Sequence, residues 1–372
     1  MNSQEWHDRY KNKGFLDNNS LAAVVTGTSP LSLGESIALN LHSALPNMSI
    51  ITISRTKNKG LEERLGYKGV SVLLDLNPSK YGDKLECGER VFKDTLQVQL
   101  EEAFLQLKGP NPQVGIHFLF NNAGAYDFGS LTKMSPESIN NLIGSNYSGH
   151  VMVAKAVMEL NSFNGVDNPT EFRLCEVGSF QGLDPRAGRS VYVSSKSPGI
   201  DFCQSEVRGK TIEVASYIAP GPIDTHMLHY NLWNKAGGEE KFVKKLYREN
   251  IGVYTKIFLE GDANALMELT EGNKEQGKMK ETFAKYLALQ ETYSKAENFA
   301  TESVDDVGRN IVNRMLLSSK DYPSDIIAYN KRWNKETKTF FKGVFSRLLD
   351  PELPNGYDKL KSVINGPWQE IK

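Results

Sequence analysis

A tyrosine and a lysine four residues apart are the first candidates for chemistry in this sequence. Tyr192 and Lys196, in Tyr-Val-Ser-Ser-Lys, share one face of a helix if the segment is helical. A phenol with a pKa of about 10 exchanges protons poorly near neutrality unless a neighbour stabilises the phenolate. One pKa unit takes about 1.4 kcal/mol, and a cation 4 Å away contributes roughly 4 kcal/mol at an effective dielectric constant of 20. Lys196 is therefore able to activate Tyr192 for proton transfer.

The spacing alone does not single out this pair, because Tyr357 and Lys361 repeat it near the end of the chain. What distinguishes Tyr192 is the order of polar residues around it. The accompanying features are Asn146 in a predicted helix, Ser179 at the end of a predicted strand, and Pro220-Gly221-Pro222-Ile223-Asp224-Thr225 after the next strand.

The elements that position these residues follow an alternating pattern. Between residues 21 and 230, short β-branched runs alternate with helical patterns, which predicts an α/β fold with a doubly wound parallel sheet. The predicted strands are 21–26, 49–54, 70–74, 116–120, 172–177 and 212–217, with a last strand at 326–329. Ser135-Pro136-Glu137 predicts a helix start, with Ser as the N-cap and Pro in the first turn.

A glycine-containing turn follows the first predicted strand. In Thr26-Gly-Thr-Ser-Pro-Leu-Ser-Leu-Gly34, the candidate cofactor contacts are Gly27, Ser32, Leu33 and Gly34. Such a turn lets backbone N–H groups and a helix N-terminus approach a pyrophosphate. Two glycines stand where a dinucleotide turn usually has three, so an ordinary connection between strand and helix is the alternative.

Basic residues follow the second predicted strand. Arg55 comes directly after it, with Lys57 and Lys59 close behind. An acidic residue at this position binds the adenosine ribose hydroxyls of NAD, whereas a basic residue accommodates the 2′-phosphate of NADP. The sequence therefore favours NADP(H); a solvated basic loop is the alternative.

Two further strand ends carry candidate nucleotide contacts. Asp75 and Leu76 follow the third strand, where the carboxylate either accepts from the adenine amino group or caps a helix. The fourth strand runs into Asn121-Asn122-Ala123-Gly124, whose small residues let the backbone pass close to the adenosine ribose.

Taken in order, these motifs resemble the short-chain dehydrogenase/reductase family over residues 21–230 and 300–330. The resemblance implies a Rossmann fold in which Tyr192 is the general acid or base. It implies that Lys196 stabilises the phenolate and holds the nicotinamide ribose, that Ser179 binds the substrate carbonyl, and that Asn146 orders a water. An oxidised nicotinamide would join Lys196 in lowering the pKa of Tyr192.

The same resemblance implies further contacts and an assembly. Pro220, Gly221, Ile223 and Thr225 would line the nicotinamide carboxamide, and a homodimer or homotetramer would form through the helices that hold Asn146 and Lys196. Within the family, Tyr217–Thr225 and Ala328-Tyr329-Asn330 are similar to sepiapterin reductase and dicarbonyl (benzil) reductases. Ile327 stands where sepiapterin reductase has the Asp that anchors its pterin. The glycine turn also departs from TGxxxGxG, with one extra residue and Ser32 for the middle glycine.

Composition excludes other classes. The chain has 44 Lys and Arg against 45 Asp and Glu, so neither nucleic acid nor an anionic membrane attracts it electrostatically. A mean hydropathy of −0.43 and the absence of a long apolar run predict no membrane span. Three cysteines without a CxxC pair, and no recognisable targeting segment, make the cytoplasm the expected location. There is no HExxH or Cys/His cluster, so no metal is expected.

At 372 residues the chain is longer than one α/β domain needs. We expect an extension at 1–20, a Rossmann domain at 21–330 with a helical insert at about 230–300, and an amphipathic helical tail at 331–372. The insert is either a lid that shapes an apolar pocket or a surface and oligomer embellishment. The tail either docks on the protein or lies on a membrane. Candidate pocket residues are Leu232, Trp233, Phe242 and Tyr254, with His226 and His229 as possible substrate contacts.

Two functions compete on this basis. The first is an NADPH-dependent carbonyl reductase acting on a ketone or α-dicarbonyl, or on the alcohol in reverse. The second is an NADP(H)-binding regulatory or scaffold protein with little catalysis, which only the altered glycine turn favours.

The cofactor preference is testable at Arg55. We expect Arg55→Asp to weaken NADPH binding about tenfold or more while NADH binding changes much less, since a charged hydrogen bond contributes about 1.5–3 kcal/mol. Titrating both cofactors by fluorescence measures this. Equal losses would show that Arg55 does not read the 2′-phosphate.

Overall fold

The computed structural model describes residues 21–348, except 82–84, 109–113, 128, 164–171, 184, 186–187, 210, 213, 296–302, 318–323 and 335–338. The chain divides into two compact units. The first comprises Met1–Gly221, Val304–Tyr329 and Gly343–Lys372, and the second comprises Pro222–Ser303 and Asn330–Lys342. The predicted 1–20 extension and the end of the tail lie outside the described residues.

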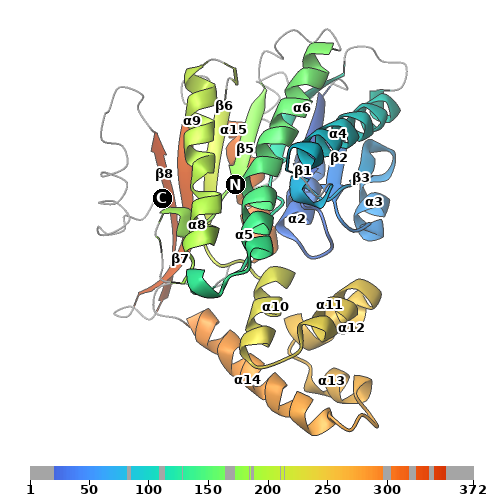
Figure 1. Cartoon of the computed structure of the whole chain (residues 1–372), viewed down its shortest axis with the longest axis vertical. Coiled ribbons are helices and arrows are strands. Elements are labelled where there is room, and N and C mark those ends of the chain that lie inside the picture. Colours follow the sequence, from blue (N-terminus) through green and yellow to red (C-terminus); the bar gives the residue numbers. More distant parts are fainter. Residues whose placement is uncertain are drawn as a thin grey trace. The chain divides into compact units, whose positions relative to one another are not determined.

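The sheet confirms the doubly wound α/β fold (Figure 1). Its strand order is β3-β2-β1-β4-β5-β6-β7-β8, and every pair from β3 to β7 is parallel. The strands are β1 Leu21–Thr26, β2 Ser49–Ser54, β3 Gly69–Leu73, β4 Gly115–Asn121, β5 Arg173–Val177, β6 Val214–Pro220, β7 Ser324–Asn334 and β8 Thr339–Leu348. The first two match their predicted bounds, because every residue in them is buried and apolar or β-branched, apart from the serines that bound β2.

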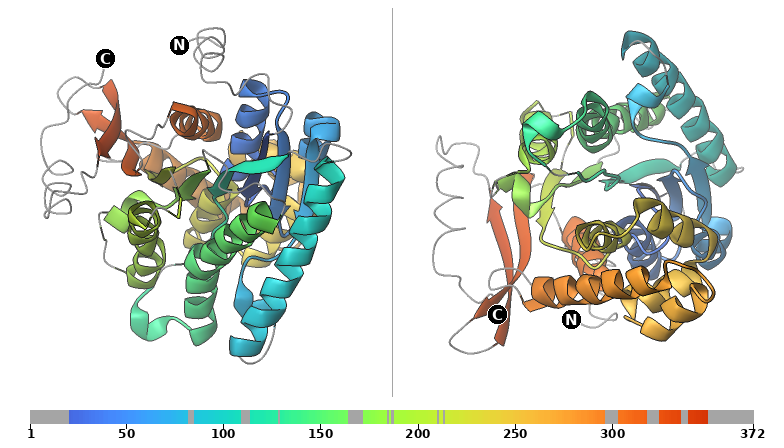
Figure 2. Two further views of the ribbon diagram at one scale, coloured as in Figure 1. Left: turned by 90° about the horizontal axis from the view of Figure 1, so that it is seen from above. Right: turned by 60° about the horizontal axis from the view of Figure 1, so that its bottom comes forward.

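Helices cover both faces of the sheet (Figure 2). On one face α2 packs against α15, where Ser36 Oγ donates to Asp305 at 3.2 Å. On the other, α4 packs against α6, and α9 lies along β6. The helices of the first unit are α2 Leu33–Ala44, α3 Lys59–Leu65, α4 Leu85–Lys108, α5 Pro136–Ile143, α6 Gly149–Phe163, α7 Phe180–Leu183, α8 Ser190–Lys196, α9 Pro198–Arg208 and α15 Val304–Leu317. As predicted, Ser135 caps α5, accepting from the Ser138 N–H at 3.1 Å.

The order of the strands reverses between β1 and β4. From β1 the chain proceeds to β2 and β3 on one side, and from β4 to β5, β6 and β7 on the other. The two strand ends at such a switch point leave a crevice in which α/β proteins bind ligands. The glycine turn after β1 and the Asn121–Gly124 segment after β4 meet at this point.

The second unit is helical over the described part of residues 226–295. Its helices are α10 His226–Lys235, α11 Glu240–Glu249, α12 Ile251–Tyr254, α13 Ala263–Leu269 and α14 Gln276–Lys295. Trp233, Phe258 and Tyr286 form its aromatic core, with ring centroids 5.4–6.2 Å apart. Leu232, Trp233 and Tyr254 are at most 1% exposed, so these candidate pocket residues face the interior instead. Half-buried Phe242 packs on Trp233 at 5.5 Å.

A histidine is locked inside this unit. His229 is fully buried, with Nδ1 2.6 Å from Tyr286 Oη and Nε2 2.7 Å from Asp224 Oδ1. Tyr286 Oη in turn donates to the Phe258 carbonyl at 2.7 Å, so its oxygen accepts from Nδ1–H. His229 therefore holds α10 to α14 and is too buried to contact a substrate in this structure.

The predicted helical tail is wrong over its described part. Residues 331–334 continue β7, and 339–348 form β8. Thr339-Phe-Phe-Lys-Gly-Val-Phe concentrates aromatic and β-branched residues, which favour a strand. The charged and apolar residues there, which suggested an amphipathic helix, fit an alternating strand equally well.

No helix in the described part of the chain is both long and apolar enough to cross a membrane.

The contribution of the Tyr286 hydroxyl to stability can be tested by removing it. Tyr286→Phe leaves the Phe258 carbonyl and the His229 Nδ1–H without this partner, and we expect the free energy of unfolding to fall by about 1–3 kcal/mol. Urea unfolding followed by tryptophan fluorescence measures it. Tyr67, which is 89% exposed, supplies the control, because Tyr67→Phe should change stability by less than about 0.5 kcal/mol. Equal effects of the two changes would contradict this role.

Candidate active site

The structure brings the four predicted catalytic residues into one buried region of the first unit. Tyr192 and Lys196 lie on α8, Ser179 follows β5, and Asn146 lies in a π-helical turn, Gly144–Ser148, between α5 and α6. None of the four is more than 9% exposed. The spacing in the sequence predicted that Tyr192 and Lys196 share a helix face. Ser179 comes close to them because it follows β5 at the edge of the sheet.

The Tyr192 hydroxyl is held as a protonated phenol. Burial raises its pKa to about 12, against a hydrogen bond from Ser179 and the charge of Arg189, which both lower it. Tyr126 packs edge-on against the ring at 4.7 Å and adds to the rise. Lys196 is not among the groups that shift this pKa. The expected phenolate stabilisation is therefore not built into the protein alone, and Tyr192 keeps its proton at neutral pH.

Lys196 is a buried amine anchored at the end of β5. Its Nζ donates to the Val177 carbonyl at 3.0 Å. Burial lowers its pKa to about 8, and the charge of Glu176 opposes that shift. The side chain is therefore cationic below pH 8 and loses its charge as the pH rises through 8.

Asn146 is bound on three sides. Its Oδ1 accepts from the Ala125 N–H at 2.7 Å, and its Nδ2 donates to the Ala125 carbonyl and to Ser195 Oγ, both at 2.9 Å. Ser195 Oγ donates in turn to the Tyr192 carbonyl at 2.7 Å. Because both amide protons are used, a water would have to bind the remaining lone pair on Oδ1.

The glycine turn is a tight backbone cradle. Gly27 has φ +73°, and a Cβ on it would lie 2.7 Å from the Ala123 Cα. A Cβ on Gly34 would lie 2.4 Å from the Gly27 carbonyl oxygen. Ser32 caps α2, accepting from the Glu35 N–H and donating to the Gly27 carbonyl, and the predicted contact Leu33 starts that helix with a buried side chain. These contacts let the backbone come close to a pyrophosphate at the start of α2.

Sequence reasoning missed a carboxylate that holds this turn. Leu31 adopts φ +57°, a left-handed conformation that glycine usually supplies, and its N–H donates to Glu35 Oε2 at 2.6 Å. Asn58 Nδ2 donates to Glu35 Oε1 and to the Thr28 carbonyl, both at 3.0 Å. The turn with its extra residue is thus held by Glu35, which also accepts a hydrogen bond from Asn58 in the loop after β2. The acidic residue in the first turn of α2 was the available signal.

Arg55 is exposed directly after β2, as a 2′-phosphate contact requires. Thr56 Oγ1 donates to Ser29 Oγ at 3.2 Å, so the Arg55 loop is tied to the glycine turn. Lys57 pairs with Glu62 at 3.2 Å on the surface. The loop that the sequence assigned to the 2′-phosphate and the turn that it assigned to the pyrophosphate therefore lie together.

The remaining candidate nucleotide contacts differ in how far their polar atoms are already used in hydrogen bonds within the protein. Asp75 Oδ1 accepts from the Asn77 N–H at 3.0 Å, so part of this carboxylate caps the turn after β3, and Leu76 is buried. Asn122 Nδ2 donates to the Thr26 carbonyl at 3.0 Å, which is a structural contact. A Cβ on Gly124 would lie 3.0 Å from Asn146 Oδ1 and 3.3 Å from Lys196 Nζ.

Thr26 is a second residue that sequence reasoning missed. Its Oγ1 accepts from the N–H groups of Asn122 and Ala123, both at 2.9 Å, and donates to the Phe120 carbonyl at 3.3 Å. One hydroxyl at the end of β1 thus fixes the segment after β4.

The Pro220–Thr225 segment spans the boundary between the units. Pro220 is the last residue of β6, and Gly221 is the last residue of this stretch of the first unit. Ile223 and Thr225 belong to the second, where the Thr225 N–H donates to the Ile223 carbonyl at 2.8 Å just before α10.

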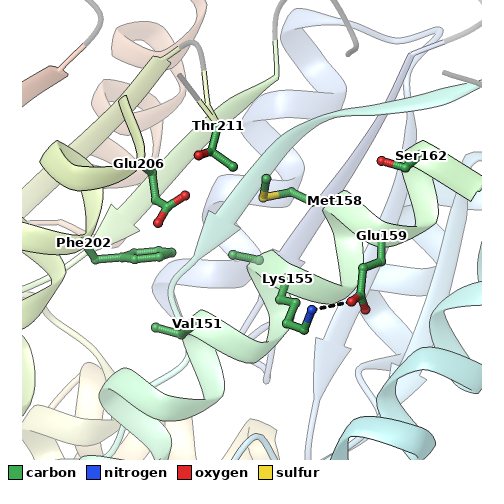
Figure 3. A pocket seen from close by; sticks show the side chains of 9 residues that line it. Val151, Lys155, Met158, Glu159, Ser162, Phe202, Glu206 and Thr211 are labelled. Carbon is green, nitrogen blue, oxygen red and sulfur yellow. Dashed lines mark hydrogen bonds and ion pairs between the residues drawn. The ribbon is translucent and has the colours of Figure 1, made fainter. Parts of the chain in front are cut away.

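A groove of about 460 Å³ lies on the first unit between α6 and α9 (Figure 3). Its lining includes Met158 and Lys155 from α6 and Phe202 and Glu206 from α9. It contains none of the four catalytic candidates. These two helices adjoin the segments that hold Asn146 and Lys196.

Comparisons with known proteins agree with this geometry. Residues 101–235 match the family model described as short chain dehydrogenase. The 3-oxoacyl-(acyl-carrier-protein) reductase of Vibrio harveyi is 32% identical over 125 residues, which are 32% of this chain and 49% of that enzyme. The chain thus spans about half the length of that relative. The Escherichia coli K12 reductase of the same name is 27% identical over 210 residues, 55% of this chain and 74% of that enzyme.

Solved structures show the same fold. L-sorbose reductase from Gluconobacter frateurii, complexed with NADPH and L-sorbose, matches at a TM-score of 0.51 with 17% identity, over 83% of this chain and 93% of that one. The KRED1-Pglu enzyme matches at a TM-score of 0.52 with 17% identity, over 80% of this chain and 95% of that one.

The fold is therefore the Rossmann-like fold of short-chain reductases. The family model covers residues 101–235, and the two reductases align with 32% and 55% of this chain, so the likeness is to part of it.

The Thr26 hydroxyl is testable by near-isosteric replacement. Thr26→Val removes the acceptor of two backbone N–H groups, and we expect the free energy of unfolding to fall by about 2–4 kcal/mol. Thr26→Ser keeps the hydroxyl and should cost less. Urea unfolding of both variants measures the difference. A serine variant as unstable as the valine variant would show that the methyl group, not the hydroxyl, matters here.

Proposed function

We propose that the protein is an NADPH-dependent carbonyl reductase that converts a ketone or α-dicarbonyl into an alcohol. The observation that carries this proposal is the buried, protonated Tyr192 hydroxyl, hydrogen-bonded to Ser179, on the same helix as the Lys196 amine. The reductase names of the relatives support it.

Each residue of the candidate site has a separate role in the proposed reduction. Ser179 binds the substrate carbonyl oxygen, and Tyr192 donates its phenolic proton to that oxygen. NADPH supplies the hydride when bound. Because burial keeps the pKa of Tyr192 near 12, the phenol of the free protein carries the proton that a reduction needs. Lys196, cationic below about pH 8, holds the nicotinamide ribose.

The described residues fit a dinucleotide. Gly27 and Gly34 remove side chains where the turn after β1 crosses the segment after β4, and the start of α2 lies beside them. Arg55 is exposed where the 2′-phosphate of NADP(H) would lie. The NADPH complex of the sorbose reductase supports the same cofactor.

Finer assignments stay predictions. These are the sepiapterin-like or dicarbonyl subtype, the homodimer or homotetramer through the segments holding Asn146 and Lys196, and the cytoplasmic location. The lid role of the second unit is likewise a proposal.

The role of Tyr192 separates a reductase from a cofactor-binding scaffold. We expect Tyr192→Phe to lower kcat by at least about 100-fold, because it removes the proton donor, while NADPH binding changes little. NADPH oxidation at 340 nm is measured against diketones, quinones and aldehydes, with NADPH fluorescence as the binding control. Absence of turnover by the unmodified protein, or undiminished turnover by the variant, would overturn the proposal.

A further inference from the structure

The Tyr217 side chain comes from β6 and ends at the backbone of a catalytic candidate. Tyr217 is 0% exposed, and its Oη accepts a hydrogen bond from the Ser179 N–H at 3.2 Å. In the register of β5 and β6 it stands beside Glu176, and Ser179 follows where β5 has ended. The phenol therefore extends along the strand direction, past the end of β5, to reach this N–H group.

Three glycines leave the space that this ring fills. A Cβ on Gly178 would lie 1.9 Å from Tyr217 Cζ and 2.0 Å from its Oη. A Cβ on Gly182, in α7, would lie 2.7 Å from Oη, and one on Gly199, in α9, would lie 3.2 Å from Cε2. Because a close-packed interior has no room for such approaches, side chains at the first two positions would displace the phenol. The ring is thus enclosed by three separate segments, which fix the place of its hydroxyl.

The backbone of Ser179 is held at its N–H and at its carbonyl. The N–H donates to Tyr217 Oη, and the carbonyl accepts from the Gly182 N–H at 2.9 Å. The Ser179 Oγ accepts from the Gln181 N–H at 3.2 Å and is hydrogen-bonded to the Tyr192 hydroxyl. Gln181 and Gly182 follow Ser179 closely in the chain, so Tyr217 supplies the tie that comes from the adjacent strand.

We propose that Tyr217 is a positioning residue for Ser179: its enclosed hydroxyl fixes the Ser179 N–H and thereby sets where Ser179 Oγ meets the substrate carbonyl oxygen. The inference rests on the proposed function of Ser179 in binding that carbonyl. A phenylalanine would fill the same space beside the glycines, but it could not accept the hydrogen bond. The hydroxyl is therefore the part of the side chain to which the positioning role belongs.

Tyr217→Phe removes this hydroxyl and keeps the ring. We expect kcat for NADPH-dependent reduction to fall about tenfold, because a displacement of about 1 Å in a reacting group can cost about 100-fold and this one should be smaller. The KM for NADPH should change by less than about twofold, since Ser179 contacts the carbonyl substrate in the proposed reaction. Steady-state kinetics with a substrate from the diketone, quinone and aldehyde panel measure this split.

A second measurement needs no turnover. Amide hydrogen exchange at Ser179 in the free protein, resolved by fragmentation mass spectrometry, should become about tenfold faster in Tyr217→Phe, because this N–H loses its acceptor.

Asn161→Leu is the matched control. Asn161 is 3% exposed, and its Oδ1 accepts from the Ile116 N–H at 3.0 Å near the amino end of β4. The change also deprives a backbone N–H of its side-chain acceptor, but far from the carboxyl ends of the strands where the candidate site lies. We expect it to lower the free energy of unfolding while kcat and the exchange at Ser179 stay unchanged.

Gly182→Ala tests the place of the hydroxyl from another side. Apart from Tyr217 Oη, the atoms nearest to the new Cβ would be the N and Cα of Ser197, at 3.5 and 3.6 Å, which are ordinary contacts. Gly182→Ala alone should therefore displace the hydroxyl and lower kcat. In the Tyr217→Phe background it should lower kcat no further, because the atom that it displaces is gone. Urea unfolding confirms that each variant is folded.

A lower kcat and faster exchange at Ser179 in Tyr217→Phe, with neither in Asn161→Leu, would support the proposal. Unchanged exchange at Ser179, undiminished kcat in an active protein, or an equal fall of kcat in Asn161→Leu would overturn it. A further loss of kcat from Gly182→Ala in the Tyr217→Phe background would also count against it. Faster exchange in a protein that reduces no carbonyl would retain the positioning of Ser179 and refute the proposed function instead.

Discussion

The candidate site depends on the meeting of two strand ends at the reversal of the sheet order. Parallel strands direct all their carboxyl ends to one edge, and the reversal between β1 and β4 opens a crevice there. At this point Thr26 Oγ1 accepts hydrogen bonds from two backbone N–H groups of the segment that follows β4. The glycine turn, Gly124, Asn146 and Lys196 are then placed relative to that fixed backbone.

Burial sets the chemistry of the site. Removing Tyr192 from water keeps its phenol protonated, and removing Lys196 from water weakens its hold on a proton. The two shifts leave a protonated phenol and, below about pH 8, a cationic amine, which are the charge states that the proposed reduction uses. Glu176 opposes the fall in the pKa of Lys196.

The sequence predicted much of the fold because the strands are buried on both faces. Runs such as Leu21–Thr26 and Ser49–Ser54 admit few alternatives, and their bounds were predicted to the residue. Where periodicity was ambiguous, the prediction failed. The described tail at 331–348 is strand, and Trp233 and Tyr254 pack in a core of their own unit, because an apolar residue on a helix does not reveal which neighbour covers it.

The sequence by itself was enough to predict the class of chemistry that we propose. The prediction came from a tyrosine and a lysine at helical spacing, preceded by Asn146 and Ser179, with Arg55 after the second strand. Only the tertiary structure decided the electrostatic state of those groups and their supports. Thr26 and Glu35 act through hydrogen bonds to residues far along the chain. Neither burial nor long-range hydrogen bonding is written in local spacing, so these residues became visible only once the chain was folded.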